Sequence, residues 1–273
     1  MLVCSLGDLT LDVSVLLSGP LAAGADTAAR IRMGAGGQAA NVAAWATELG
    51  ADARFLGKTG IDEPARLARA ELGELGVEIV GPQTGRNGVI CALVSSSGER
   101  SMASDRGVAV MLAVDELEPA WLDGCDHLFV SGYALFRQPV RDAARRAVEL
   151  ARERGAAVSV DLASWSDLQH AGVDEIRSVV AALGPDLVFA NEDEAHLFGA
   201  PPPGATLILK RGTKGASFDG DEHAALPVER VVDTTGAGDA LAAGFIVGGP
   251  ELALEAAARC IQTLGALPIR STR

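Results

Sequence analysis

The segment 127–162, HLFVSGYALFRQPVRDAARRAVELARERGAAVSVDL, decides the fold class. It contains a short apolar strand pattern at 127–132, a helix pattern with a charged face at 139–155, and a second apolar strand pattern at 156–162. Two short apolar strands joined by an amphipathic helix predict a right-handed crossover between parallel strands. The segment therefore predicts an α/β protein.

The same alternation continues on both sides of this unit. Downstream, the sequence predicts further helices and strands, then a hairpin and two alanine-rich helices, at 173–183, 186–190, 191–199, 206–210, 215–228, 237–247 and 251–264. Upstream, it predicts a strand at 2–8, a helix at 38–49 and a strand at 53–60. We expect one central, mostly parallel sheet that is covered by helices on both faces.

Two stretches interrupt this alternation, at about 11–33 and about 77–106. Both show strand patterns without a helix, and neither is long enough to form a domain. We expect them to form a small β-sheet attached to the α/β body, which is a suitable origin for a lid. No linker divides the chain, so residues 1–273 are predicted to form a single domain with these lid segments inserted in it.

The composition excludes several classes of partner. The chain has 23 basic and 36 acidic residues, a net charge of −13, which disfavours nucleic acid and anionic membranes. Its longest apolar stretch, 240–249, is about half the ~20 residues of a membrane helix. The four cysteines lie far apart and form no C-x-x-C motif, which predicts a reduced, cytoplasmic protein.

Two glycine-rich segments each open a helix, Gly34–Asn41 and Asp233–Asp239. The start of a helix offers backbone N–H groups and the positive end of the dipole, so each segment is a candidate anion site. The second also carries a carboxylate in the first turn. Asp239 is explained if it accepts the proton of a hydroxyl that attacks a phosphoryl group. Spacing alone equally allows Asp239 merely to complement the helix dipole.

The first segment has two other interpretations. Gly34, Gly36 and Ala39 fit the Gly-x-Gly-x-x-Ala pattern of dinucleotide binding, which would make the protein a nicotinamide-dependent oxidoreductase. That pattern normally follows the first strand, and an acidic residue normally ends the next strand; neither holds here. The glycines are also compatible with close packing at a helix start and no ligand.

Taken together, the two segments resemble the signatures of the ribokinase-like, or PfkB-family, carbohydrate kinases. The first reads Gly36-Gly37-x-Ala39-x-Asn41, with Gly50 and Gly60 at the family's spacing, and the second reads DTTGAGDALAAGF, Asp233–Phe245. The resemblance covers essentially the whole chain. It implies a three-layer α/β/α sandwich with a central mostly parallel sheet and a small β-sheet lid. It also implies transfer of a phosphoryl group from ATP, with Mg²⁺, to a sugar hydroxyl.

The resemblance further implies roles for individual residues. Asp239 is the expected general base, and the backbone N–H groups of Gly236, Ala237 and Gly238 are the expected anion hole. The residues implied to bind substrate are Asp12, Gly36, Gly37 and Asn41. Those implied to bind the nucleotide are Asn191, Glu194, Lys210, Gly212, Gly215 and Thr235. Glu194 would hold Mg²⁺ through water, and Asp233 would lie beside a monovalent cation such as K⁺.

Several of these residues also have purely structural interpretations. Asn191 and Glu194 form a capping-box pattern at a helix start, which is compatible with a metal held through water. Asp12 is also typical of a turn, and Lys210 lies in a basic stretch that can be a solvated face. Arg106, beside the predicted lid, is suited to bind a substrate carboxylate or phosphate, or to pair with Asp105 or Glu99.

The substrate stays open at this point. Where the family often has Ala-Asn after the lid, this chain has Val108-Ala109. A nucleoside kinase of the same fold, of the adenosine, cytidine or pseudouridine type, is the alternative to a sugar kinase. Aromatic residues are only 4% of the chain, which favours a sugar over a stacked base. An uncovered face of the lid sheet is a candidate contact for a homodimer.

Overall fold

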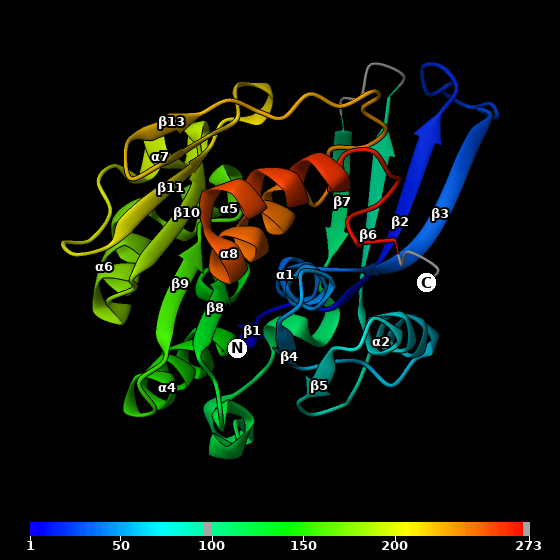
Figure 1. Ribbon diagram of the computed structural model, residues 1–273. Coiled ribbons are helices and arrows are strands. Elements are labelled where there is room, and N and C mark those ends of the chain that lie inside the picture. Colours follow the sequence, from blue (N-terminus) through cyan, green and yellow to red (C-terminus); the bar gives the residue numbers. More distant parts are fainter. Residues whose placement is uncertain (96–99, 270–273) are drawn as a thin grey trace.

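The structure of the chain, a computed structural model, describes residues 1–95 and 100–269. Within these residues, one nine-stranded sheet forms the centre of the protein (Figure 1). Its strands are, in spatial order, β13 (Asp221–His223), β12 (Ala216–Phe218), β11 (Thr206–Lys210), β10 (Leu187–Asn191), β9 (Ala157–Asp161), β8 (His127–Ser131), β1 (Leu2–Leu6), β4 (Asp52–Leu56) and β5 (Glu78–Val80). All neighbours from β11 to β5 pair in parallel, and only the pairs β11–β12 and β12–β13 are antiparallel.

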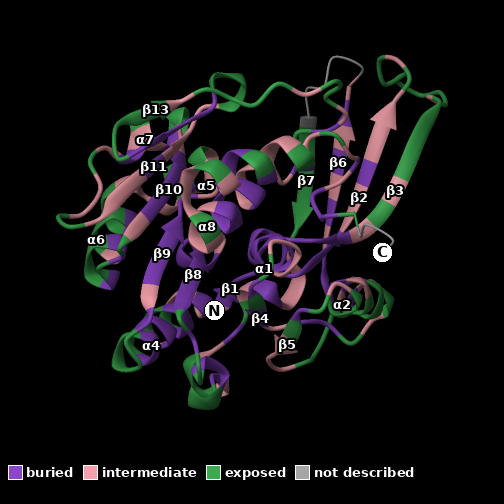
Figure 2. Cartoon of the chain, in the orientation of Figure 1, coloured by how far each residue is buried: buried purple, intermediate pink, exposed green. Residues whose placement is uncertain are grey.

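Helices cover both faces of this sheet. They are α1 (Gln38–Glu48), α2 (Glu63–Glu74), α3 (Gly132–Leu135), α4 (Val140–Glu153), α5 (Trp165–Ala171), α6 (Val173–Leu183), α7 (Glu192–Phe198) and α8 (Ala237–Cys260). Successive residues of β8 belong to different cores: Leu128 and Val130 pack with α4 and α6, and Phe129 packs with α1 and α8. The inner strands β1, β8 and β9 are therefore buried on both faces, as Figure 2 shows, and the predicted α/β/α sandwich is confirmed.

Four helices differ from the sequence-based expectation: α2, α3 and α5 were not predicted, and α8 joins two predicted helices. Asp62 caps α2 by accepting a hydrogen bond from the Ala65 N–H at 3.3 Å, and Pro64 lies in its first turn. Helix α8 contains both predicted alanine-rich helices, separated by non-helical dihedral angles at Gly248 and Gly249, and it ends at Cys260. In length and composition α8 alone among the described helices is suited to cross a membrane, a weak indication that buried core helices share.

A separate four-stranded sheet stands at one end of the body, at the upper right of Figure 1. Its order is β3 (Ala29–Gly36), β2 (Thr10–Leu17), β6 (Gly88–Val94) and β7 (Arg100–Asp105), with β2 and β6 parallel and the outer pairs antiparallel. These strands come from the two predicted lid stretches. One correction applies: β5 lies in the second stretch but pairs with β4 in the large sheet.

The small sheet has one covered face and one uncovered face. Along β6, buried and half-buried residues alternate without exception. On this face β3, β2 and β6 carry apolar residues, namely Val13, Val15, Ile31, Met33, Cys91 and Leu93, whereas β7 adds the polar Ser101 and Asp105. Ile31 and Met33 are each 61% exposed, and Figure 2 shows the strand that carries them, β3, largely in the exposed and intermediate colours.

Strand β3 is tied to the body at two points. The Arg32 guanidinium donates to the Leu264 carbonyl oxygen and pairs with Glu71 of α2. The same Glu71 accepts a hydrogen bond from the Ala35 N–H at 2.6 Å. These contacts hold the small sheet next to the carboxyl edge of the large one.

Candidate active site

The predicted site residues gather at the carboxyl edge of the large sheet. Parallel strands all end at one edge, so Asp161, Asn191 and Lys210, the last residues of β9, β10 and β11, lie there together. The start of α8 reaches the same edge. A Cβ atom built on Gly238 would lie 3.3 Å from Lys210 Nζ, so the predicted anion hole and this lysine are in contact.

Asp239, in the first turn of α8, is bonded to the other glycine-rich segment. Asn41 Nδ2 of α1 donates a hydrogen bond to Asp239 Oδ2 at 2.8 Å. Burial raises the pKa of Asp239 to about 7, and the nearby carboxylates of Asp161 and Asp8 act in the same direction, whereas Asn41 and Lys210 oppose the shift. A carboxylate with a pKa near neutrality is suited to accept a proton from a hydroxyl.

The turn before α8 is fixed by Asp233, which is 2% exposed. Its Oδ1 accepts hydrogen bonds from the Thr235 N–H at 2.9 Å and from Thr235 Oγ1 at 2.6 Å, and its Oδ2 accepts one from the Gly265 N–H at 3.0 Å. Gly236 follows with φ +79°, and a Cβ there would lie 2.5 Å from that of Ala266, so only glycine fits.

The three amides of the predicted anion hole are not equivalent. The Ala237 N–H donates to the Thr234 carbonyl oxygen at 3.3 Å, a long bond that closes the turn. Gly238 lies against the Lys210 side chain. The geometry thus adds an ammonium group to a site that was predicted from backbone amides alone.

Lys210 forms a buried ion pair. Its Nζ donates to Asp161 Oδ1 at 2.9 Å and Oδ2 at 2.7 Å; the Asp161 side chain is fully buried and that of Lys210 is 14% exposed. Burial alone would lower the pKa of Lys210, but the carboxylates of Asp161 and Glu194 outweigh it and raise this pKa above its usual value. Lys210 therefore stays an ammonium ion.

Asn191 and Glu194 form the capping box that their spacing predicts. The Glu194 N–H donates to Asn191 Oδ1 at 2.8 Å, and both Glu194 oxygens accept from Asn191, from its backbone N–H at 2.9 Å and its Nδ2 at 2.8 Å. Glu194 is only 2% exposed, and burial raises its pKa. Because both oxygens accept hydrogen bonds from Asn191, the Glu194 carboxylate is fixed in orientation at the start of α7.

Asp12 lies on β2 where the small sheet meets the body. Thr10 Oγ1 donates to Asp12 Oδ1 at 2.7 Å, and burial raises the pKa of Asp12 to about 6. A Cβ on Gly36 would lie 2.1 Å from the Asp12 carboxyl group. Gly37 has φ +96°, and a Cβ there would lie 2.4 Å from the Asp8 carbonyl oxygen. Both glycines are required by close approach, and they leave Asp12 at the base of the small sheet.

Arg106 has a partner that the sequence did not predict. It pairs with Asp8 at 2.7 Å and lies over the ring of Tyr133, with its guanidinium carbon 3.5 Å from the ring centroid. Asp105 instead pairs with Arg86, and Glu99 lies outside the described residues. Within the described part of the chain, Asp8 Oδ1 and Asn41 Oδ1 are buried without a hydrogen-bond partner.

The predicted nucleotide loop after β11 is less basic than its sequence indicates. Besides Lys210, Arg211 pairs with Glu192 and Glu222, and Lys214 pairs with Glu192. Gly212 and Gly215 have φ +57° and +97°, and a Cβ on Gly215 would lie 2.0 Å from the His223 carbonyl oxygen. The loop is a tight glycine turn whose charges are compensated.

The dinucleotide interpretation is wrong. Gly34 and Gly36 end β3, which is antiparallel to β2 in the small sheet. The pyrophosphate turn of a dinucleotide fold requires glycines between a parallel strand and its helix, where the helix start meets the ligand. Only Gly37 immediately precedes α1.

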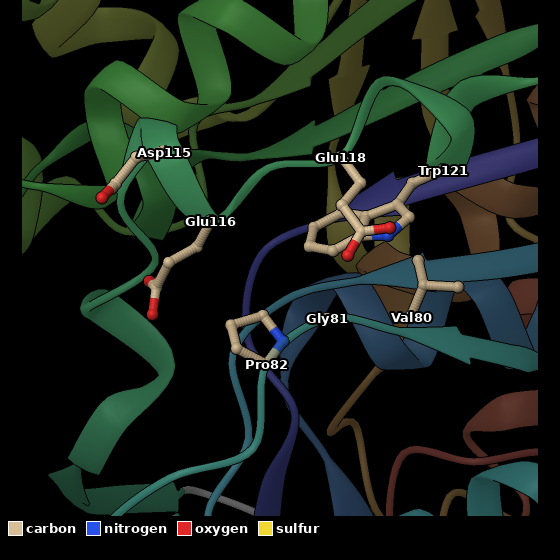
Figure 3. Close-up of a pocket in the computed structure, with 7 residues that line it drawn as sticks. All are labelled: Val80, Gly81, Pro82, Asp115, Glu116, Glu118 and Trp121. Carbon is tan, nitrogen blue, oxygen red and sulfur yellow. The ribbon is translucent and has the colours of Figure 1, made fainter.

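Two surface pockets lie outside this cluster. One, of about 470 Å³, is lined by Asp115, Glu116, Glu118 and Trp121 with Val80–Pro82, and Figure 3 shows these side chains. Three carboxylates disfavour a phosphate ligand there. The other, of about 420 Å³, lies between β3 and the loop that follows α8. Among the described residues, no group of three or more His, Cys, Asp or Glu side chains is arranged to hold a metal ion directly.

Three residues of the site were not predicted: Asp8, Asp161 and Tyr133. Each has a signal in the sequence, since Asp161 is the last residue of a buried strand of the parallel sheet, and Asp8 and Tyr133 each lie two residues after the end of one. Residues at that edge are the ones a ligand meets in open α/β sheets. The pairs that they form, Asp8 with Arg106 and Asp161 with Lys210, have no such signal.

Comparisons with known proteins show what the chain is similar to. A family model described as "pfkB family carbohydrate kinase" matches residues 1–272. The ATP-dependent ribose-1-phosphate kinase of Halopiger xanaduensis is 32% identical over 273 residues, which cover 93% of this chain and 86% of that protein. Fructokinase-1 of Zea mays is 30% identical over 233 residues, 77% of this chain and 72% of that one.

Solved structures show the same fold. The adenosine kinase from Sinorhizobium meliloti has a TM-score of 0.87 and 23% identity, and the match covers 98% of this chain and 96% of that one. An uncharacterized sugar kinase from Pyrococcus horikoshii in complex with ATP has a TM-score of 0.81 and 20% identity, with 98% and 95% covered.

Proposed function

Because the chain belongs to the pfkB family of carbohydrate kinases, we propose that it transfers the γ-phosphoryl group of ATP to a hydroxyl of a sugar or a sugar-like molecule. The observation that carries this proposal is the Asn41–Asp239 hydrogen bond of 2.8 Å, beside the start of α8. It places a carboxylate with a near-neutral pKa next to backbone amides and an ammonium group.

The proposed reaction uses these positions. Asp239 accepts the proton of the attacking hydroxyl, while the amides at Gly236–Gly238 face the charge that develops on the phosphoryl group. Asp12, Gly36, Gly37 and Asn41 form the floor that holds the other hydroxyls. The small sheet acts as a lid that keeps water, a competing acceptor, out of the site.

The site is suited to a nucleotide that arrives with Mg²⁺. Asp161, Glu194 and Asp239 surround one lysine, so the edge carries an excess of carboxylates that repels bare phosphates. Oxygen ligands and waters are what Mg²⁺ prefers. Glu194 and Asn191 would hold the ion through water. The ion would neutralise charge on the phosphates. Gly212, Gly215 and Thr235 would border the nucleotide.

A monovalent cation such as K⁺ is proposed beside Asp233. Its carboxylate accepts hydrogen bonds from the Thr235 and Gly265 N–H groups, so it ties the turn before α8 to the loop at Gly265 and leaves one buried negative charge between the two segments. A cation at this point would hold the two segments together without contact with the substrate.

The acceptor is proposed to be a sugar, with a nucleoside as the alternative. The 32% identical relative acts on ribose 1-phosphate and the 30% identical relative is a fructokinase, whereas the similarity to adenosine kinase is one of fold. The Tyr133 ring, beside the site, has one face covered by the Arg106 guanidinium, which removes that face as a stacking surface for a base. Asp8 neutralises the charge of Arg106. We therefore propose that Arg106 binds substrate hydroxyls and does not require a carboxylate or phosphate on the substrate.

We further propose a homodimer through the lid, because the uncovered face of the small sheet is apolar in its centre. The cytoplasm is the proposed location, since the four cysteines form no disulfide within the described residues and three of them are buried. Nucleic acid and membranes are not proposed as partners, because the net charge of −13 repels both.

The decisive experiment is a coupled ADP-release assay with MgATP and a panel of sugars, sugar phosphates, sugar acids and nucleosides. The Asp239→Asn variant is the matched control, since it keeps the shape of the site and removes the base. The proposal would be supported if the wild type turned over one class of acceptor and Asp239→Asn did not. Equal turnover by both proteins would refute the role of Asp239, and ATP binding without turnover on any acceptor would refute the proposed substrates.

A further inference from the structure

The Lys210 side chain is not explained by a place in the nucleotide loop. The Lys210 ammonium group does not lie in the glycine turn at 212–215. It lies against the start of α8. A Cβ on Gly238 would lie 3.2 Å from Lys210 Cδ and 3.3 Å from Nζ. The absence of a Cβ at Gly238 therefore gives the ammonium group access to the first turn of α8.

Asp161 holds this ammonium group in one orientation. Both of its oxygens accept from Lys210 Nζ, at 2.9 and 2.7 Å, and its side chain is fully buried. An ammonium group has three N–H donors, and Asp161 takes two of them. No other residue described in the structure accepts a hydrogen bond from Nζ, so one donor is left for a ligand. A buried ion pair adds little to the stability of a protein, so stability alone does not explain why Asp161 and Lys210 are paired here.

We propose that Lys210 is a catalytic residue that contacts the transferring phosphoryl group, and that Asp161 is the positioning residue that holds its ammonium group in place. The inference rests on the proposed kinase function. In the step itself, the bond between the acceptor oxygen and the γ-phosphorus forms, the bond from that phosphorus to the bridging oxygen of ADP breaks, and the acceptor proton passes to Asp239. Lys210 keeps its protons and neutralises charge on the equatorial phosphoryl oxygens.

The test compares ground-state and transition-state ligands. Lys210→Met is assayed by calorimetry for binding of MgADP alone and of MgADP with aluminium fluoride, which imitates the transferring phosphoryl group, in the presence of the acceptor. We expect unchanged affinity for MgADP within about threefold and a loss of about 100-fold or more for the aluminium fluoride complex, because a contact made mainly in the transition state is removed. The turnover number kcat falls by a similar factor.

Lys58→Met is the matched control. Lys58 pairs with Glu116 at 2.5 Å, and its side chain is 12% exposed against 14% for Lys210, but it lies outside the site. It should bind both ligands as the wild type does. If Lys210→Met also binds the aluminium fluoride complex like the wild type while the wild type is an active kinase, the role of Lys210 is refuted and the proposed function stands.

Removal of one member of a buried ion pair can unfold a protein, so a double variant completes the test. Lys210→Met with Asp161→Asn leaves no unpaired charge, and it should melt near the wild-type temperature yet still fail to bind the aluminium fluoride complex tightly. If it binds that complex normally, the inference is wrong.

The single variant Asp161→Asn tests positioning separately. Lys210 lowers the pKa of Asp239 and Asp161 raises it. The acidic limb of kcat/KM should therefore move to higher pH in Lys210→Met and to lower pH in Asp161→Asn. Asn41, of α1, and Asp8, after β1, also act on Asp239 and are unchanged in both variants. Asp161→Asn should also weaken binding of the aluminium fluoride complex, because the Lys210 ammonium group is no longer held in place, while its affinity for MgADP stays within about threefold of the wild type. Wild-type binding of that complex by Asp161→Asn would contradict the positioning role. A wild-type protein without kinase activity on any acceptor would overturn the proposed function and this inference together.

Discussion

Asn41 and Asp239 are separated by 198 residues in the sequence and joined by a hydrogen bond of 2.8 Å, from Asn41 Nδ2 to Asp239 Oδ2. The first residue belongs to the first turn of α1 and the second to the first turn of α8, so the bond links the starts of two helices that pack side by side. Its direction matters. The Asn41 amide donates and the Asp239 carboxylate accepts, so the bond stabilises the ionised form of this carboxylate.

Replacement of the carboxylate should abolish chemistry and spare nucleotide binding. We expect Asp239→Asn to lower kcat by about 10²- to 10⁴-fold, which is the usual contribution of a general base. The affinity for MgATP should stay within about threefold of the wild type, since the backbone amides at Gly236–Gly238 are kept. Steady-state kinetics and calorimetry measure the two quantities. Near-normal kcat in this variant would show that another group accepts the proton.

Activity should depend on pH in a defined direction. A base works in its ionised form, and the pKa of Asp239 is about 7, so kcat/KM should rise with pH and level off above about 7. Below about pH 6 Asp12 also takes up a proton, and the slope of log kcat/KM against pH should approach 2. A profile that is flat between pH 5 and pH 8 would contradict both assignments.

Asn41 should tune this profile. Because its amide donates to the carboxylate, it lowers the pKa of Asp239, and Asn41→Leu should move the limb of the profile to higher pH. At pH above the shifted limb, much of the lost activity should return. Activity that is lost equally at every pH would instead assign Asn41 to substrate binding alone.

Much of the scaffold was predictable because the parallel strands are short apolar runs between amphipathic helices. Strands β8 to β11 and helices α4, α6 and α7 match the predicted ranges within a few residues. Helix α2 was missed because its sequence is charged and buries only Ala65, Ala68 and Leu72, two of which are small. Strand β5 has three residues, too few to show a period.

The polar pairs of the site were beyond prediction for a different reason. Asp239 and Asn41 were each singled out by a motif, but their contact depends on how α1 and α8 pack. The same holds for Arg106, whose neighbours in the sequence include Asp105, yet whose partner is Asp8, 98 residues away. Residue type and spacing identify which groups reach the sheet edge, whereas the fold decides which of them meet.

Gly36→Ala should weaken acceptor binding selectively. The new methyl group would lie 2.1 Å from the Asp12 carboxyl group, so this side chain must move. Loss of a hydrogen bond to a charged group, about 1.5–3 kcal/mol, corresponds to a KM for the acceptor raised by about 10- to 150-fold. MgATP affinity should not change. Gly19→Ala is the control, because no atom lies within 4 Å of a Cβ built there. Equal KM values in the two variants would contradict the role of Asp12.

The proposed dimer interface on the small sheet can be tested by placing one charged side chain on its apolar face. Ile31 is 61% exposed on the apolar face, where it belongs to the edge strand β3, and Ile31→Glu should convert a dimer to a monomer in multi-angle light scattering. The wild type should have twice the mass of the 28.0 kDa chain. Ile61→Glu, at a position that is 73% exposed before α2, should leave the mass unchanged. A monomeric wild type at micromolar concentration would exclude this interface.

Asp233 should matter more for stability than for chemistry. Its carboxylate accepts three hydrogen bonds while 2% exposed, and Asp233→Ala leaves those donors without their acceptor. We expect a loss of about 3 kcal/mol, since each bond to a charged group is worth about 1.5–3 kcal/mol and solvent recovers part of it. For a chain of this size the melting temperature should fall by about 6–12 °C. Asp26→Ala, on an exposed loop, is the control and should melt with the wild type.

A cation beside Asp233 would make this stability depend on the salt. If K⁺ binds there, the wild type should melt at a higher temperature in potassium chloride than in tetramethylammonium chloride at equal ionic strength, because only the folded state binds the ion. Asp233→Asn keeps the shape of the side chain and removes its charge, so it should lose that difference. A wild-type melting temperature that is the same in both salts would contradict the cation site, while the tether from Asp233 to Gly265 would still account for the destabilisation by Asp233→Ala.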